Sequence, residues 1–128
     1  MLDPKIIAQH YIIAALWADA PEGTNSRAPR ETEEKALQLA RDFLRAIGPK
    51  CQEYLKNNTE YSKHPDCRGR AEAAIGHDLW LTSQGHGTGF LDRRALREDV
   101  REFLTGIAQR KEFTLHPEFY RGWLYLYG

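Results

Sequence analysis

The apolar positions near the N-terminus recur every three or four residues, which is the spacing of one face of a helix. Asp3 can accept hydrogen bonds from free backbone N–H groups and Pro4 suits the first helical turn, so the helix should begin there. It should end before Pro21. The residues on its broad buried face are Ile6, Ile7, His10, Tyr11, Ile13, Ala14 and Trp17.

Similar patterns predict further helices. One begins near Pro29 or Arg30, where acidic residues in the first turn complement the positive end of the helix dipole. Gly48-Pro49 should kink this helix or start a fresh one, because proline removes a backbone donor. A short helix is expected over 67–75, and another after Asp92. The apolar stripe of the last helix consists of Leu96, Val100, Phe103, Leu104 and Ile107.

Two segments alternate as strands do. In "DLWLT" (78–82), leucines point to one side of an extended chain, and Trp80 and Thr82 point to the other. The glycines of "SQGHG" (83–87) suit a hairpin turn that leads into "TGFLD" (88–92). The same alternation recurs at the C-terminus. There Leu124 and Leu126 share one side, and Trp123, Tyr125 and Tyr127 share the other.

Together these elements predict an α+β fold. We expect an antiparallel sheet of three or four strands, built from a hairpin over 78–92 and a strand over 122–127, with three to five helices mainly on one face. A chain of 128 residues should form one domain over 1–128, with a mobile loop at 20–29 and a loop at 57–66. The open face would carry an aromatic patch, unless the N-terminal helix covers it. The patch consists of Trp80, Trp123, Tyr125 and Tyr127.

Composition narrows the class of function. Eighteen basic and eighteen acidic side chains give a formal net charge of zero, which disfavours non-specific binding to nucleic acid. No apolar run approaches the roughly 20 residues that a membrane span requires, and the N-terminus lacks the features of a secretory signal. Cys51 and Cys67 form no C-x-x-C motif and no disulfide framework. These features predict a cytoplasmic protein without membrane contact.

His77, Asp78 and His86 are the candidate catalytic residues. Histidine titrates near neutral pH and a neighbouring carboxylate can fix its tautomer, as a metal-assisted hydrolase or nuclease would require. However, adjacent side chains in a strand point apart, and the H-x8-H spacing is not typical of a zinc site. We therefore expect no metal or other cofactor, and interpret His77 and Asp78 as local hydrogen-bonding groups.

Nucleic-acid binding is a third possibility. An aromatic sheet beside Arg93, Arg94, Arg97 and Arg101 could stack single-stranded bases. Acidic residues alternate with these arginines, which favours an ordinary solvated helix face.

The segment "AIGHDLWLTSQGHGTGFLDR" (74–93) resembles a motif, GHDxWLTxxGHGxGFxDR, shared by small proteins of tailed bacteriophages and prophages. Here Leu79 replaces the usual Phe, Ser83 an Arg and Leu91 a Trp. A weaker similarity extends to "YIIAALWA" (11–18) and "YLYG" (125–128). The resemblance implies a phage origin and action in a bacterial cytoplasm. Such proteins often bind and inhibit host machines, including defence complexes such as those of CRISPR systems.

The leading hypothesis is therefore a non-enzymatic protein that binds a host or phage protein and inhibits or redirects it. The candidate partner-binding residues are Trp80, His86, Arg93, Trp123, Tyr125 and Tyr127.

Overall fold

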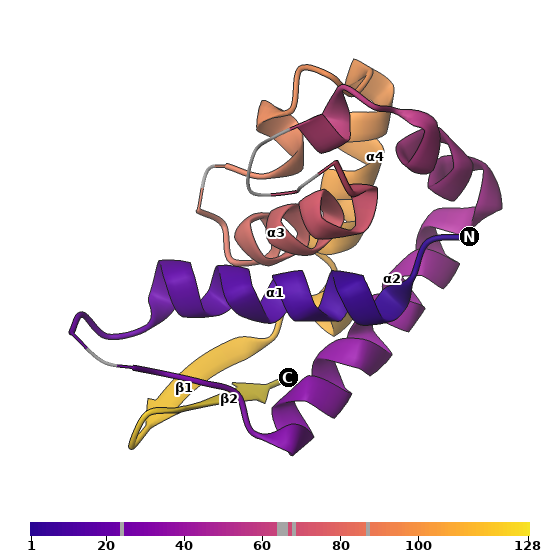
Figure 1. Cartoon of the computed structure of the whole chain (residues 1–128). Coiled ribbons are helices and arrows are strands. Elements are labelled where there is room, and N and C mark those ends of the chain that lie inside the picture. The colour runs from indigo at the N-terminus through magenta and orange to yellow at the C-terminus, as the bar shows by residue number, and fades with distance from the viewer. Residues whose placement is uncertain (24, 64–66, 68, 87) are drawn as a thin grey trace.

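The computed structural model describes residues 1–23, 25–63, 67, 69–86 and 88–128. The described residues form four α-helices and one β-hairpin (Figure 1). The elements are α1 (Pro4–Asp19), α2 (Arg30–Asn57), α3 (Ala71–Ser83), α4 (Glu98–Ala108), β1 (His116–Tyr120) and β2 (Trp123–Tyr127). Short 3-10 turns lie at Tyr61–Lys63, Phe90–Asp92 and Lys111–Phe113. The predicted α+β class is confirmed.

Helix α1 begins and ends as its sequence predicts. The side chain of Asp3 accepts a hydrogen bond of 2.9 Å from the backbone N–H of Lys5, which caps the first turn. The helix ends at Asp19, before Pro21.

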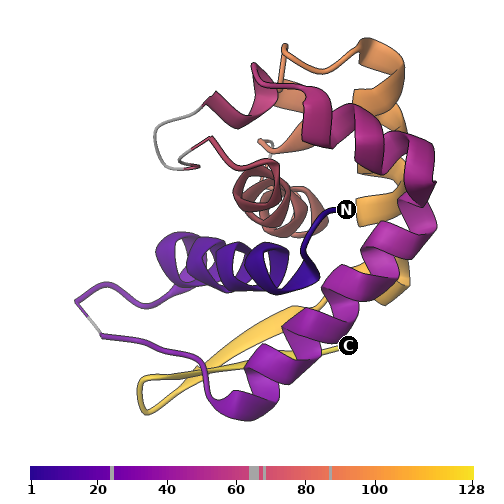
Figure 2. The ribbon, with the colours of Figure 1, turned by 45° about the vertical axis from the view of Figure 1, so that its right-hand side comes forward.

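Helix α2 is long and kinked. Gly48 interrupts its helical geometry with a φ of +83°, a conformation that glycine adopts without steric cost, and Pro49 follows. The predicted interruption is therefore confirmed. The kink bends α2 into an arc along one side of the molecule, and α1 and α3 lie side by side within that arc (Figure 2).

Residues 71–83 are helical, so the predicted hairpin over 78–92 is wrong. All residues of α3 except Glu72 and His77 are buried. A helix buried on every side has no polar face, and periodicity alone cannot distinguish it from a buried strand. The segment 88–92 is also not a strand, because residues 90–92 form a 3-10 turn. The glycine-rich segment still turns sharply, since Gly85 and Gly89 have φ values of +70° and +108°. Gly87 lies outside the described residues.

The C-terminal hairpin is the only sheet in the described part of the chain. It has two strands, so the predicted number of three or four strands is wrong. Strands β1 and β2 pair antiparallel across a two-residue turn at Arg121-Gly122, where both φ values are positive. Arg27 adds one isolated bridge. Its N–H donates to the Gly122 carbonyl at 2.9 Å, and its carbonyl accepts from the N–H of Leu124 at 2.8 Å.

Helix α2 covers the leucine side of the hairpin, as predicted for one face of the sheet. Leu124 and Leu126 are buried there. The hydroxyl of Thr32 donates to the Leu124 carbonyl at 2.7 Å, and Lys35 Nζ donates to the Leu126 carbonyl at 2.9 Å. The opposite side of the hairpin carries Trp123, Tyr125 and Tyr127, which confirms the alternation expected from the sequence.

The predicted loops at 20–29 and 57–66 largely lie between α1 and α2 and after α2. Residues 24 and 64–66 lie outside the described residues. The mobility of the loop at 20–29 and the single-domain organisation stay predictions.

Candidate functional site

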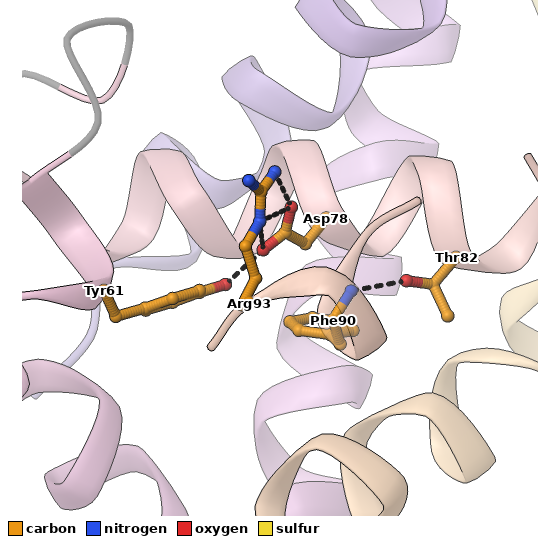
Figure 3. Close-up of polar contacts among 5 residues, drawn as sticks. All are labelled: Tyr61, Asp78, Thr82, Phe90 and Arg93. Carbon is orange, nitrogen blue, oxygen red and sulfur yellow. Dashed lines mark hydrogen bonds and ion pairs between the residues drawn. The ribbon is translucent and has the colours of Figure 1, made fainter. Parts of the chain in front are cut away.

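The motif of residues 76–93 contains a buried ion pair. Asp78, on α3, is fully buried, and Arg93 reaches it from the segment that returns across α3 (Figure 3). The guanidinium donates through Nη2 to Oδ1 at 2.6 Å and through Nε to Oδ1 and Oδ2 at 2.9 and 3.0 Å. The hydroxyl of Tyr61 donates to Oδ2 at 2.8 Å. The carboxylate is thus surrounded by donors, as a buried charge requires.

The environment of this ion pair alters two pKa values. Burial raises the pKa of Tyr61 well above its ordinary value, and the neighbouring charge of Asp78 raises it further. Hydrogen bonds to Asp78 raise the pKa of Arg93. Both shifts favour the protonated forms, a neutral Tyr61 hydroxyl and a charged Arg93 guanidinium.

We expect the free energy of unfolding to fall as pH rises above about 10. Tyr61 holds its proton more tightly in the folded state, so this stabilising contribution is complete below the unfolded pKa and is lost at higher pH. Tyr61→Phe should make the decline less steep and cost about 1 kcal/mol at neutral pH through the lost hydrogen bond. Urea unfolding at several pH values measures both effects. The exposed Tyr120→Phe is the control, and an unchanged decline in Tyr61→Phe would contradict the expectation.

The two motif histidines lie in different surroundings. The Nε2 atom of His86 lies 3.3 Å from the Asp19 carboxylate, which also accepts a hydrogen bond of 2.6 Å from Trp80 Nε1. The ring of His77 instead contacts Trp17, with a distance of 5.9 Å between ring centroids. Of the candidate catalytic residues, His77 therefore lines the same cleft as Tyr61 and Arg93, which hold Asp78, whereas His86 lies elsewhere, beside Asp19.

The remaining polar motif residues fasten the returning segment to α3. The hydroxyl of Thr82 accepts a hydrogen bond of 3.1 Å from the backbone N–H of Phe90, as Figure 3 shows. A side chain at Gly89 would collide with the Thr82 hydroxyl, so the close approach requires glycine. Phe90 is buried and stacks on Phe43 of α2. Most of the described motif thus has a structural explanation.

A cleft of about 820 Å³ lies between α1 and the cluster around Asp78. The polar and aromatic residues that line it include His10, Trp17, Tyr61, His77 and Arg93. Within the described part of the chain, no three His, Cys, Asp or Glu side chains are arranged to hold a metal ion.

The aromatic side of the hairpin is the clearest exposed feature. Tyr120 pairs with Trp123 and Glu118 with Tyr125 in the strand register, so these residues share one face. Tyr120 and Tyr127 are 61% and 51% exposed. We define the aromatic hairpin face as Tyr120, Trp123, Tyr125 and Tyr127.

Basic side chains flank this face. The guanidinium carbon of Arg27 lies 4.5 Å from the centre of the Trp123 ring, and that of Arg121 lies 5.3 Å from the Tyr120 ring. Lys35 Nζ lies 5.8 Å from the Tyr127 ring. At these distances each cation is attracted to the electron-rich face of its ring.

The structure removes Trp80 from the predicted partner-binding residues, and the role of the others stays a prediction. Trp80 is fully buried and packs edge-on against Tyr11 of α1, so it cannot contact a partner. The alternative, that the N-terminal helix covers the patch, therefore holds for Trp80. Arg93 is occupied by its ion pair, and His86 lies beside Asp19. Trp123, Tyr125 and Tyr127 do share a face, with the addition of Tyr120. In the sequence, Arg121-Gly122 is a signal for a two-residue turn, which could have revealed that Tyr120 pairs with Trp123 across the hairpin.

Comparison with protein-family models, with curated proteins and with solved structures found no match to this chain. No helix in the described residues is both long enough and apolar enough to cross a bilayer.

Proposed function

We propose that this protein acts by binding another protein through the aromatic hairpin face. The supporting observation is a row of four rings on the side of a two-stranded hairpin that α2 does not cover. Tyrosine and tryptophan are enriched at interface hot spots because they combine a large apolar area with a polar group.

The flanking cations indicate the chemistry of the partner surface. Arg27, Lys35 and Arg121 would meet acidic side chains on the partner, and the rings beside them would supply the apolar contact. The resemblance of residues 74–93 to phage proteins points to a bacterial or phage protein as the partner. Among the possible outcomes of such binding, we favour inhibition of a host protein complex, such as a defence complex.

The geometry favours this proposal over a hydrolase. Asp78 already accepts hydrogen bonds from Arg93 and Tyr61, and His86 lies in a different cluster. Single-stranded nucleic acid could also stack on aromatic rings beside arginines, but the formal net charge of zero lacks the basic excess typical of such proteins.

A pull-down from bacterial lysate treated with nuclease tests the proposal. The full chain should enrich a specific protein, and the double variant Tyr120→Ser/Tyr127→Ser should reduce that enrichment by about tenfold or more. Two exposed aromatic anchors that each supply about 1 to 2 kcal/mol account for such a loss. Quantitative mass spectrometry measures the amount of partner captured by the wild type relative to the amount captured by the double variant.

The matched control is Phe103→Ser, which removes an exposed ring from α4, away from the hairpin. It should leave enrichment unchanged. Equal capture by the wild type and the double hairpin variant would reject the aromatic hairpin face as the binding surface. Capture of RNA or single-stranded DNA that disappears on nuclease treatment would favour the nucleic-acid alternative.

A further inference from the structure

The cleft beside the Asp78 ion pair has the size of a site for a small organic molecule. Its volume of about 820 Å³ falls within the range of roughly 300 to 1,000 Å³ that is typical of ligand pockets. Ala14 of α1 and Ala73 and Ala74 of α3 form part of its lining, so we call it the α1–α3 cleft. A molecule much larger than a single ion therefore fits it.

The α1–α3 cleft presents positive charge. Among the described residues that line it, none is acidic. Arg93 lines the cleft with a side chain that is 31% exposed. Its partner Asp78 is fully buried and does not contribute to the lining, so the ion pair turns its positive member toward the cleft.

The ion pair leaves part of the guanidinium of Arg93 unused. Asp78 accepts hydrogen bonds from Nε and Nη2, whereas Nη1 donates to none of the described residues and is turned away from the carboxylate in Figure 3. His10 and His77 also line the cleft. An imidazole can donate a hydrogen bond through one ring nitrogen even where the other is engaged. Guanidinium and imidazole N–H groups match the oxygens of carboxylates and phosphates, so these groups favour an anion.

An exposed ring stands beside the same cleft. Trp17 lines it and is 75% exposed, and its ring centroid lies 5.9 Å from that of His77, with the two rings tilted by 41°. An indole in this position offers a flat apolar surface on which another planar ring can stack.

We propose that the α1–α3 cleft binds a small organic anion that carries a planar ring. The anionic group is a carboxylate or a phosphate and accepts hydrogen bonds from Nη1 of Arg93, and the ring stacks on Trp17. The site is separate from the aromatic hairpin face, so this inference does not depend on the function proposed for that face.

Calorimetric titration of the full chain tests the site. The probes are adenosine monophosphate, which joins a ring to a phosphate, and 2-aminobenzoate, which joins a ring to a carboxylate. At least one should bind with a Kd of about 1 mM or below, and comparison of the two identifies the preferred anionic group. The uncharged counterparts adenosine and aniline, and inorganic phosphate without a ring, should bind at least about tenfold more weakly, because each lacks one of the two contacts.

Two substitutions locate the bound probe. Trp17→Ser removes the stacking surface, and Arg93→Lys keeps a cation beside Asp78 but removes Nη1. Each should weaken binding by about fivefold or more, as expected for the loss of one contact of about 1 kcal/mol. The matched controls are Phe103→Ser, at an exposed ring of α4, and Arg94→Lys, at the exposed residue next to Arg93. Both controls should bind as the wild type does.

Three results would overturn the proposal. They are the failure of both probes to bind at about 1 mM, affinity that Trp17→Ser leaves unchanged, and equal affinity for a probe and its uncharged counterpart. Circular dichroism of each variant confirms that the chain has folded. Trp17 is mostly exposed, so its substitution decides the question even if Arg93→Lys does not fold.

Discussion

Replacing Gly76 with alanine should lower the free energy of unfolding by about 2 to 3 kcal/mol, although alanine is the better helix former. Gly76 lies where α3 contacts α1. A Cβ atom there would overlap the carbonyl oxygen of Ile7 and would lie 2.8 Å from the Tyr11 nitrogen and 2.9 Å from the His10 Cβ. Two of these three atoms belong to the backbone of a helix, so a change of rotamer cannot relieve the overlap. The helices would have to move apart, and the tight packing between them would be lost.

Gly106→Ala is a control with the opposite expected sign. Gly106 lies within α4, and apart from its chain neighbours and the nearby backbone of its own helix, no atom of the described residues lies within 4 Å of the position that its Cβ would take. Alanine should therefore stabilise the protein by about 0.5 to 1 kcal/mol through its higher helix propensity. Urea unfolding of both variants measures the two changes. Equal stabilisation by both substitutions would show that α1 and α3 do not pack as closely as the structure indicates.

The successes of sequence reasoning share a local cause. The capping residues Asp3 and Pro4, the interruption at Gly48 and the alternation in β2 act over a few neighbouring residues. Such signals do not depend on what packs against the element, so the sequence shows them directly.

The prediction for residues 78–92 failed because its signal depends on the surroundings. Helix α3 packs against α1 on one side and contacts α2, α4 and the returning segment elsewhere. Its residues are buried in almost every direction, so the polar face that identifies a surface helix is missing. Leu79 and Leu81 then resembled one side of a strand. Only long-range packing distinguishes the two structures, and a single sequence does not contain that information.

The candidate site was affected by the same error. Asp78 was interpreted as a local hydrogen-bonding group, but its charged partner is Arg93, fifteen residues further along the chain. The motif therefore contains both halves of one ion pair. A loop separates Asp78 from Arg93 in the sequence, so no periodic pattern indicates that the two side chains form a pair. By contrast, the aromatic hairpin face was largely predictable, because strand alternation and a two-residue turn determine it.

Removing Arg93 tests the structural interpretation of the motif. Arg93→Met keeps most of the aliphatic stem but leaves the fully buried carboxylate of Asp78 without its charged partner. Loss of one member of a buried ion pair typically costs about 3 to 5 kcal/mol. We expect a value near the lower end, because the side chain of Arg93 is 31% exposed and water can partly replace it. Arg94→Met, which removes an exposed charge from the next residue, should change stability by less than about 0.5 kcal/mol.

A second substitution separates the buried charge from a simple loss of packing. Asp78→Asn in the Arg93→Met background removes the unpaired charge, and the amide oxygen can still accept the hydrogen bond of Tyr61. The double variant should therefore unfold with at least half of the lost free energy restored, as measured in urea. Equal or greater instability of the double variant would mean that Arg93 stabilises the fold through its stem and not through Asp78. Recovery would establish that Asp78 holds the returning segment against α3 through its ion pair with Arg93. It would show that the buried carboxylate destabilises the fold when it has no charged partner.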